Sequence, residues 1–316
     1  MKIGKYLFPL LLCGALPGAD SVSLDTGTGV LYGTLELPPG KAPYPVVLII
    51  AGSGPTDRDG NTALIPGKNN SLKMIAESLA ARGIASLRTD KRGIAQSKTA
   101  MAKESDLRFE TYVDDMVRWG EYLKKDSRFN SLVVAGHSEG SLIGMLAAQK
   151  LAANGYISIA GIGEPAGKTI LRQLRGQPLP PEFVKQAETA VKSLEEGHIV
   201  DPVPAGLEGL IRASVQPYLI SWLKYDPSRE IAKLKMPILI LQGTTDIQVT
   251  ADDAKMLHDA SPPSKLVIVE GMNHVLKMVP PGQKEQIASY GDPDLPVAPK
   301  LLDEITELVH KAQASR

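Results

Sequence analysis

The sequence predicts an α/β fold built on a mostly parallel, doubly wound sheet, into which a helical segment is inserted. Short, unbroken apolar runs recur along the chain, as expected for strands that are buried on both faces of a parallel sheet. Helical patterns separate these runs, so that strands and helices alternate. The alternation stops between residues 167 and 230, where prolines such as Pro178 and Pro202 break a series of helical segments. We therefore expect a core of residues 20–166 and 231–316 and a helical cap of residues 167–230.

The length and charge of the chain limit the functions that it can have. α/β folds often exceed roughly 200 residues as one domain, so 316 residues do not require two independent domains. The 35 basic and 35 acidic residues give a formal net charge of zero. The chain therefore has no excess of positive charge, which a nucleic-acid binder would be expected to have. A small neutral substrate is the better expectation, and the sequence leaves the oligomeric state open.

The first 19 residues have the pattern of a secretory signal. Lys2 and Lys5 precede an apolar stretch at 6–16, and Ala15 and Ala19 offer two cleavage sites. The stretch is too short to span a bilayer comfortably, and no later segment reaches the roughly 20 apolar residues that a spanning helix needs. We therefore expect an exported protein, periplasmic or secreted, without a stable membrane span.

The single cysteine, Cys13, lies inside this signal. Cleavage would leave a mature chain without cysteine, which suits an oxidising compartment and excludes both disulfides and thiol catalysis. A lipid anchor on Cys13 is the alternative interpretation. That signal normally has a small residue just before the cysteine, whereas Leu12 is large.

The expected elements follow the chain in order. A hairpin near the start has strands at 21–24 and 30–37, joined by a turn that contains Asp and Gly. The core strands then come at 46–50, 84–87, 132–135, 156–160, 238–241 and 266–269. Helices are expected between them at 71–81, 109–125 and 142–153, from the spacing of their apolar residues.

Two apolar stripes dominate the inserted segment. Most of their residues should pack on one another and on the core, while Tyr218 and Trp222 are also candidates to line a substrate pocket. The first stripe comprises Phe183, Val184, Ala187, Val191 and Leu194, and the second comprises Leu207, Leu210, Ile211, Val215, Tyr218, Leu219 and Trp222.

The strongest chemical motif is the segment 136–140, Gly-His-Ser-Glu-Gly, which we call the elbow. It stands directly between a predicted strand and a predicted helix. A sharp turn at such a place holds the serine in a strained backbone conformation and exposes its hydroxyl at the carboxyl edge of the sheet. The amino terminus of the following helix favours negative charge there. Ser138 is therefore the expected nucleophile, rather than a passive serine in a tight glycine turn.

A serine hydroxyl needs a base to remove its proton, and the sequence offers five histidines. Only His274 follows a core strand in a glycine-bearing loop. His137 lies inside the elbow, and we expect its side chain to point away from Ser138. The other three lie in the inserted segment or on predicted surface helices: His198, His258 and His310. We therefore expect His274 to be the general base.

The base in turn needs a carboxylate that holds its tautomer and stabilises its protonated form. Asp246 closes the loop after a core strand, which places it at the carboxyl edge of the sheet. Asp252 and Asp253 open a helix, where capping is the simpler role. Glu270 is too near His274 in sequence to reach it easily. Asp246 is therefore the expected acid, and the other three carboxylates are the alternatives.

Acyl transfer also needs N–H donors for the oxyanion of the tetrahedral intermediate. One is expected from the backbone of Glu139, directly after the nucleophile. The other is expected from the loop after the strand 46–50, where Gly52 and Gly54 let the backbone approach a substrate, and we assign it to Ser53. Alternatively, these glycines only form a turn.

Together these residues resemble the α/β-hydrolase superfamily over essentially the whole chain after residue 19. The similarity to a group of bacterial carboxylesterases lies in the elbow and in three further segments: Gly-Ser-Gly-Pro-Thr-Asp-Arg-Asp-Gly-Asn at 52–61, Asp-Lys-Arg-Gly at 90–93, and Gln-Gly-Thr-Thr-Asp at 242–246. The resemblance implies hydrolysis of short acyl esters without a cofactor. Ala51 departs from the pattern where many relatives have histidine, and Ala95 where a glycine is common.

Asp57, Arg58 and Asp59 belong to the first of these segments. We expect buried ion pairs that brace the loop, with binding of a polar substrate group as the alternative.

The sequence thus predicts a serine carboxylic ester hydrolase that acts through an acyl-enzyme on a small-molecule ester. A peptidase or amidase on the same triad is the alternative. A silent binding module would normally lack a triad residue. The sequence contains neither a Cys/His cluster nor an HExxH pattern that would indicate a metal site. The acyl chain length stays open, because fold analogy does not supply it.

Overall fold

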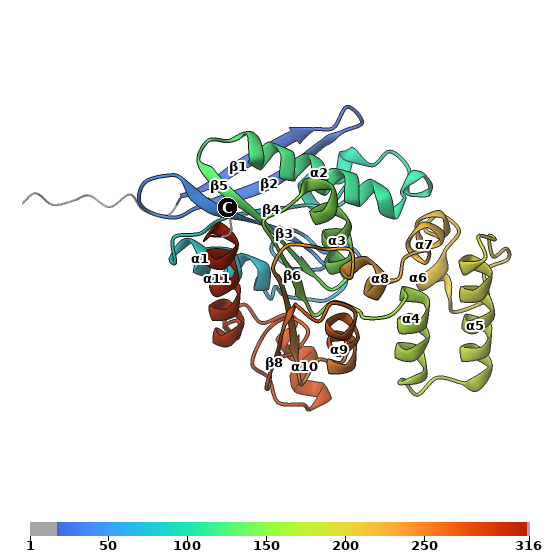
Figure 1. Cartoon of the computed structure of the whole chain (residues 1–316). Helices are drawn as coiled ribbons and strands as arrows, with labels where there is room; N and C mark the ends of the chain where they lie inside the picture. Colours follow the sequence, from blue (N-terminus) through green and yellow to red (C-terminus); the bar gives the residue numbers. More distant parts are fainter. Residues whose placement is uncertain (1–17, 315–316) are drawn as a thin grey trace, which may run out of the picture.

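The computed structural model describes residues 18–314 of the chain. Within this range, an eight-stranded sheet forms the centre of the molecule, in the spatial order β1-β2-β4-β3-β5-β6-β7-β8 (Figure 1). β2 is antiparallel to both of its neighbours, and the pairs from β4 to β8 are parallel. The strands are β1 (Gly18–Asp25), β2 (Val30–Leu37), β3 (Tyr44–Ile50), β4 (Ala85–Thr89), β5 (Phe129–His137), β6 (Gly155–Ile159), β7 (Ile238–Gly243) and β8 (Lys265–Val269).

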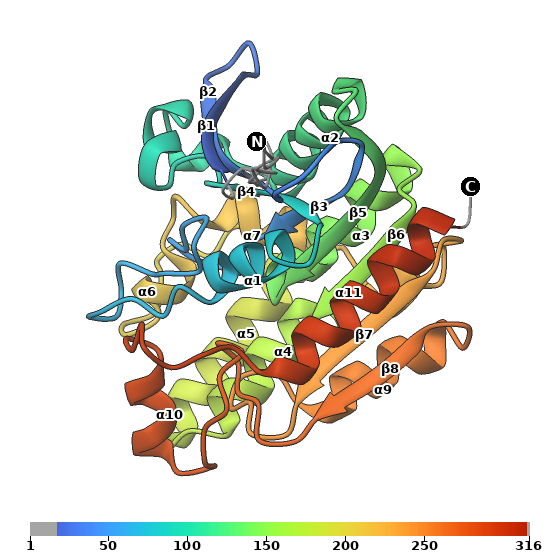
Figure 2. The same cartoon turned by 90° about the vertical axis from the view of Figure 1, so that its left-hand side faces the viewer.

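Helices cover both faces of this sheet. α1 and α11 lie across one face, which Figure 2 shows from the front, and α2 and α3 cover the other. The α-helices are α1 (Ser71–Ala80), α2 (Phe109–Lys125), α3 (Glu139–Leu151), α4 (Ala166–Arg175), α5 (Pro181–Glu195), α6 (Glu208–Ile211), α7 (Gln216–Trp222), α8 (Pro227–Ile231), α9 (Ala251–Ala260), α10 (Gln283–Ser289) and α11 (Pro299–Ala314), and two 3₁₀ helices are η1 (Ala95–Ala100) and η2 (Glu104–Asp106). The predicted doubly wound sheet is confirmed.

The residues of β3 show how one strand serves two hydrophobic cores. Val46, Leu48 and Ile50 pack in the core beneath α2 and α3. Val47 and Ile49 pack in the core beneath α1 and α11. Because successive side chains of a strand point to opposite faces, a strand that is covered on both faces needs the unbroken apolar run that the sequence shows.

Helices α4 to α7 gather at one side of the molecule, away from the layers that cover the sheet (Figure 1). α7 is attached to the start of α2. There Phe109 stacks on Trp222 with ring centroids 6.1 Å apart and donates its backbone N–H to Ser221 Oγ at 2.8 Å. α8 contacts α3 and α9 instead, so the end of the inserted segment lies against the core.

Several boundaries differ from the prediction. α3 begins at Glu139 rather than at residue 142, because the turn at Ser138 leads straight into the helix. The second apolar stripe is divided between α6 and α7, which residues 212–215 separate. The predicted signal falls mostly on residues 1–17, outside the described residues. No helix among residues 18–314 is long and apolar enough to cross a membrane.

Candidate active site

Ser138 lies in the turn between β5 and α3, and its backbone has φ 54° and ψ −122°. A residue other than glycine rarely adopts a positive φ, so this turn concentrates strain at one residue. The chain can turn so tightly because its neighbours lack side chains. A Cβ at Gly136 would lie 2.0 Å from the carbonyl oxygen of Gly140, and one at Gly140 would lie 2.5 Å from that of Ile50. The local geometry is the strand, turn and helix that the elbow motif requires.

The structure brings Asp246 and His274 together from two different strand ends. Asp246 follows β7, His274 follows β8, and His274 Nδ1 donates to Asp246 Oδ2 at 2.8 Å. Both side chains are buried, that of Asp246 completely. With the proton on Nδ1 held by the carboxylate, His274 Nε2 keeps a lone pair that can accept a proton. This is the arrangement of a general base and the acid that orients it.

The surroundings of Asp246 favour its charged form. Burial alone would raise the pKa of this carboxyl, but the adjacent His274 and the backbone N–H groups of Val249 and Gln248 outweigh burial and hold the pKa below its usual value. Those two N–H groups bond to Oδ1 at 2.9 and 2.8 Å. Gln242 Nε2 adds a hydrogen bond to Oδ2 at 3.0 Å. A charged Asp246 can stabilise the imidazolium that forms when His274 takes up a proton.

His137 connects the elbow to the loop that carries His274. Its Nε2–H donates to the His274 carbonyl oxygen at 2.8 Å, and the centroids of the two rings lie 4.8 Å apart. Burial, and next the proximity of His274, lower the pKa of His137 to about 3, so its ring is neutral. His137 therefore holds the backbone of His274 against the elbow, a role that the motif alone does not reveal.

The loop after β3 packs against the elbow. A Cβ at Gly52 would lie 3.1 Å from Cβ of Ser138, so a side chain at this position would crowd the serine. Ser53 and Glu139, the two residues assigned as N–H donors, line the same cavity as Ser138. The loop after β3 therefore leaves little room for a side chain at position 52 beside Ser138 and His137.

A buried polar network surrounds the side chain of Glu139. Lys91 Nζ lies 3.2 Å from Glu139 Oε2 and donates to the Gly52 carbonyl oxygen at 2.5 Å. The hydroxyl of Tyr218, on α7, donates to Glu139 Oε1 at 2.6 Å. The side chains of Lys91 and Glu139 are each only 3% exposed. Motif analysis gave a role to the backbone of Glu139 but found none for its carboxylate or for Lys91.

A cavity of about 520 Å³ includes Ser138 in its wall. The core contributes Ser53, Lys91 and Glu139, and α4, α6, α7 and the segment between α6 and α7 contribute much of the remainder. Two polar atoms of residues in this wall, Thr169 Oγ1 and Trp222 Nε1, are buried without a hydrogen-bond partner among the described residues. The lining residues from α4 to α7 are Ala166, Thr169, Ile170, Gln173, Gly209, Leu210, Arg212, Val215, Tyr218, Leu219 and Trp222.

Comparison with known proteins agrees with this geometry. Residues 67–196, which contain the elbow, match the serine aminopeptidase family S33. Esterase EstD of Thermotoga maritima is 26% identical over 267 residues, covering 80% of this chain. The match spans 59% of the length of that curated relative.

Solved structures match over nearly the whole chain. Est1E of Butyrivibrio proteoclasticus with bound ferulic acid has a TM-score of 0.58 at 20% identity, covering 93% of this chain and 100% of the other. Proline iminopeptidase of Mycobacterium smegmatis has a TM-score of 0.61 at 14% identity, covering 94% of this chain and 99% of the other. The chain has the α/β-hydrolase fold.

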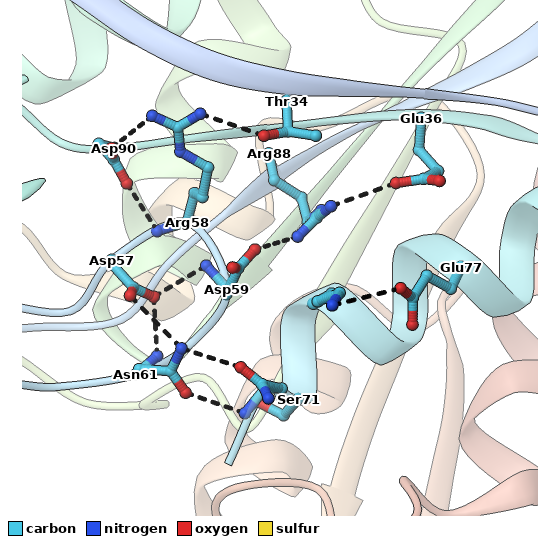
Figure 3. Close-up of polar contacts among 12 residues, drawn as sticks. Thr34, Glu36, Asp57, Arg58, Asp59, Asn61, Ser71, Glu77, Arg88 and Asp90 are labelled. Carbon is cyan, nitrogen blue, oxygen red and sulfur yellow. Dashed lines mark hydrogen bonds and ion pairs between the residues drawn. The ribbon is translucent and has the colours of Figure 1, made fainter. Parts of the chain in front are cut away.

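Ion pairs fix the segment 57–61, which follows the loop after β3 (Figure 3). Arg58 Nη2 lies 2.5 Å from Asp90 Oδ2, and its backbone N–H bonds to Oδ1 of the same carboxylate at 2.9 Å. Asp59 pairs with Arg88, which also binds Glu36 at 3.2 Å. These contacts tie the segment to β2 and β4.

Asp57 shapes the same segment from within. Its Oδ1 accepts the backbone N–H groups of Asp59 and Asn61, each at 2.9 Å. Among the described residues that line the cavity, Asp57, Arg58 and Asp59 do not occur. The three charged residues therefore brace the loop.

Two of the alternative acids have other partners. Asp253 accepts the backbone N–H of Thr250 at 2.9 Å and pairs with Arg172 at 2.7 Å. Asp252 is exposed and pairs with Lys255 at 2.8 Å. Within residues 18–314, Asp246 is the carboxylate that bonds to the ring of His274.

Proposed function

We propose that the protein is a serine carboxylic ester hydrolase that acts through an acyl-enzyme. Ser138 is the nucleophile, His274 the general base and Asp246 the acid that orients it. One observation carries the proposal: Asp246 and His274 form a bonded pair, and His274 is bonded in turn to His137, which directly precedes Ser138 in the strained turn between β5 and α3. Three strands supply these groups, and only the folded sheet assembles them.

The chemistry follows from the geometry. His274 Nε2 takes the proton from the Ser138 hydroxyl as the oxygen attacks the ester carbonyl carbon, and the backbone N–H groups of Ser53 and Glu139 bind the resulting oxyanion. The imidazolium then gives its proton to the leaving alkoxide, and the acyl group stays on Ser138. Water attacks the acyl-enzyme by the same route and releases the carboxylic acid.

The nature of the substrate is proposed from the cavity and the relatives. Side chains such as Leu210, Val215 and Leu219 make much of the wall apolar, which suits an acyl or alcohol group of modest size. The matched relative from Thermotoga maritima is an esterase, and Est1E was solved with ferulic acid bound. We propose that residues 167–230 act as a cap that decides which esters fit.

A peptidase or amidase is the second candidate. The match of residues 67–196 to a serine aminopeptidase family favours it, because the same triad can attack an amide. Purified protein should be assayed on p-nitrophenyl esters of increasing acyl length and on aminoacyl p-nitroanilides. The ester hydrolase proposal requires esters to have the higher kcat/KM. A higher kcat/KM on the anilides would instead make the peptidase or amidase the proposed function.

Ser138→Ala tests the nucleophile. The variant should fold and lose turnover by about a million-fold, as removal of a triad serine does elsewhere. A fluorophosphonate probe should label the wild type and leave the variant unlabelled. Ser141→Ala is the matched control: Ser141 is buried one turn further along α3, bonds to Tyr156 and lies outside the described cavity wall, so it should still be labelled. Labelling of Ser138→Ala would place the nucleophile elsewhere.

Export belongs to the proposal as well. Residues 1–19 would direct the chain out of the cytoplasm, and cleavage after Ala15 or Ala19 would remove Cys13. Amino-terminal sequencing of the protein from a cell fraction outside the cytoplasm tests this. An intact amino terminus would contradict it.

A further inference from the structure

Lys91 has a chemical environment that the proposed triad does not use. It follows β4, and its side chain lies in the cavity wall although it is only 3% exposed. Burying a lysine is unfavourable unless its charge is paired and its donors are satisfied. Here the ammonium meets the Gly52 carbonyl, the Glu139 carboxylate and the ring of Tyr112, whose centroid is 5.3 Å away. Two of its three N–H groups are thus used by the protein, and its charge is paired.

These contacts join two segments that meet only in space. Gly52 directly precedes Ser53 in the loop after β3, and Glu139 directly follows Ser138. Lys91 is 39 residues from Gly52 and 48 residues from Glu139 along the chain. One ammonium group therefore binds both segments that supply the proposed N–H donors.

The peptide bond transmits the contact at Gly52 to the donor at Ser53. This peptide is trans, so the Gly52 C=O and the Ser53 N–H lie in one plane and point in opposite directions. The hydrogen bond of 2.5 Å from Lys91 holds the carbonyl on one side of the loop. It thereby fixes the direction of the Ser53 N–H on the other side.

Tyr218 holds the carboxylate of Glu139 at the oxygen opposite the one that Lys91 binds. Its hydroxyl donates to Glu139 Oε1 at 2.6 Å, while Lys91 holds Oε2. Burial, and next the charge of Glu139, raise the pKa of Tyr218 well above its usual value, so the hydroxyl stays a donor. The first residue of α3 is thus held from the core and from α7 at once.

We propose that Lys91, through Gly52 and Glu139, positions the two N–H donors of the oxyanion hole. This role rests on the proposed hydrolase function and adds a positioning residue to it. Lys91 touches no reacting atom and acts only through the direction of the Ser53 N–H and the placement of the Glu139 N–H.

Lys91→Met tests the role with a side chain of similar length that makes neither polar contact. Removing one oxyanion donor outright costs about 10² to 10³ in kcat. Loss of its direction should cost about 10- to 100-fold in kcat, with KM nearly unchanged. Affinity for a trifluoromethyl ketone, which forms an oxyanion in the site, should weaken by the same factor. Inhibition by the alcohol product, which forms none, should stay the same.

Two further variants separate positioning from stability. Arg92→Met is the matched control, because Arg92 is the next residue, pairs with buried Asp115 at 2.7 Å and lies outside the described cavity wall. It should lower Tm. Both the kcat per active site and the affinity for the trifluoromethyl ketone should stay unchanged. If Lys91→Met fails to fold because Glu139 is left unpaired, the double variant Lys91→Met/Glu139→Gln replaces it, since that site buries no charge.

All rates are normalised to active sites titrated to completion with a fluorophosphonate. A kcat within twofold of the wild type, or a reduced kcat with unchanged ketone affinity, would overturn the role of Lys91. A wild-type protein that neither reacts with the fluorophosphonate nor hydrolyses esters would instead overturn the proposed function.

Discussion

The carboxylate of Asp246 can be changed with little change in shape. Asn keeps the Oδ1 that accepts from Gln248 and Val249, but it can present an N–H₂ group to His274. The ring of His274 would then accept at Nδ1 and carry its proton on Nε2. In that tautomer Nε2 cannot accept the proton of Ser138. We expect Asp246→Asn to fold normally and to lower kcat by about 10³ to 10⁴, measured by steady-state ester hydrolysis.

Asp252→Asn is the matched control for this change. Asp252 is exposed and pairs with Lys255 on the surface of α9, so its variant should keep the wild-type kcat. Near-normal turnover of Asp246→Asn would remove the acid assignment and return Asp253 and Glu270 to consideration.

At this scale, local patterns locate the residues that would touch the substrate but miss those that position them. Five consecutive residues place Ser138 and Glu139, and the ends of apolar strands place Asp246 and His274. The structure brings Asp246 and His274 into contact and ties His274 to His137, the residue before Ser138, while their catalytic roles stay predictions. Lys91 belongs to the segment 90–93, but no local pattern gives it a role, because its partners lie 39 and 48 residues away. Tyr218 likewise lies 79 residues from Glu139.

Among the elements, the buried strands were the most predictable. Their apolar runs are dictated by burial on both faces, and the order of strands and helices then follows. The division between α6 and α7 was missed, although Pro217 occupies the first turn of α7, where proline commonly starts a helix. α10 was missed because its seven residues are short, mostly polar and without apolar periodicity.

α7 offers the clearest test of the proposed cap. Trp222 lines the cavity and also stacks on Phe109 with the ring planes 5° apart. Trp222→Ala should enlarge the cavity and shift the preferred ester to a longer acyl chain, measured as kcat/KM across a p-nitrophenyl ester series. It should also lower stability, by less than the roughly 3 to 5 kcal/mol that truncating a fully buried tryptophan costs.

Tyr225→Ala is the matched control, since Tyr225 contacts the same Phe109 ring at 5.4 Å but lies outside the described cavity wall. It should lower Tm without moving the chain-length optimum. If Tm falls in both variants and the chain-length optimum of Trp222→Ala is unchanged, Trp222 is a packing residue only. The role of the cap in specificity would then have no support.

For the whole molecule, the parallel sheet explains why groups so far apart in sequence share one site. β5, β7 and β8 run in the same direction, so their carboxyl ends meet at one edge. Ser138, Asp246 and His274 each follow one of these ends, and the carboxyl edge is where open α/β sheets bind ligands. Helices α4, α6 and α7 then complete the cavity at that edge.

The loop that carries His274 is tied to the remainder of the molecule by a buried lysine. Lys277 is fully buried, and its ammonium bonds to the Leu295 carbonyl and lies 2.9 Å from Met74 Sδ of α1. Burial lowers the pKa of Lys277 to about 8, although Asp292 opposes the shift. A lysine in the unfolded chain has a pKa of about 10.4.

Between these two pKa values the unfolded chain binds the proton of Lys277 and the folded chain does not, so stability rises with pH in that window. The gain is at most about 1.4 kcal/mol for each pH unit. Lys277→Met removes this dependence of stability on pH. The variant's stability at neutral pH does not enter the comparison, which concerns only the change between two pH values. We expect the free energy of unfolding in urea, wild type minus variant, to rise by roughly 2 to 3 kcal/mol between about pH 8 and 10. Lys73→Met, which removes an exposed lysine of α1, is the matched control for loss of an ammonium group. A difference that does not change with pH would show that the folded protein keeps Lys277 charged.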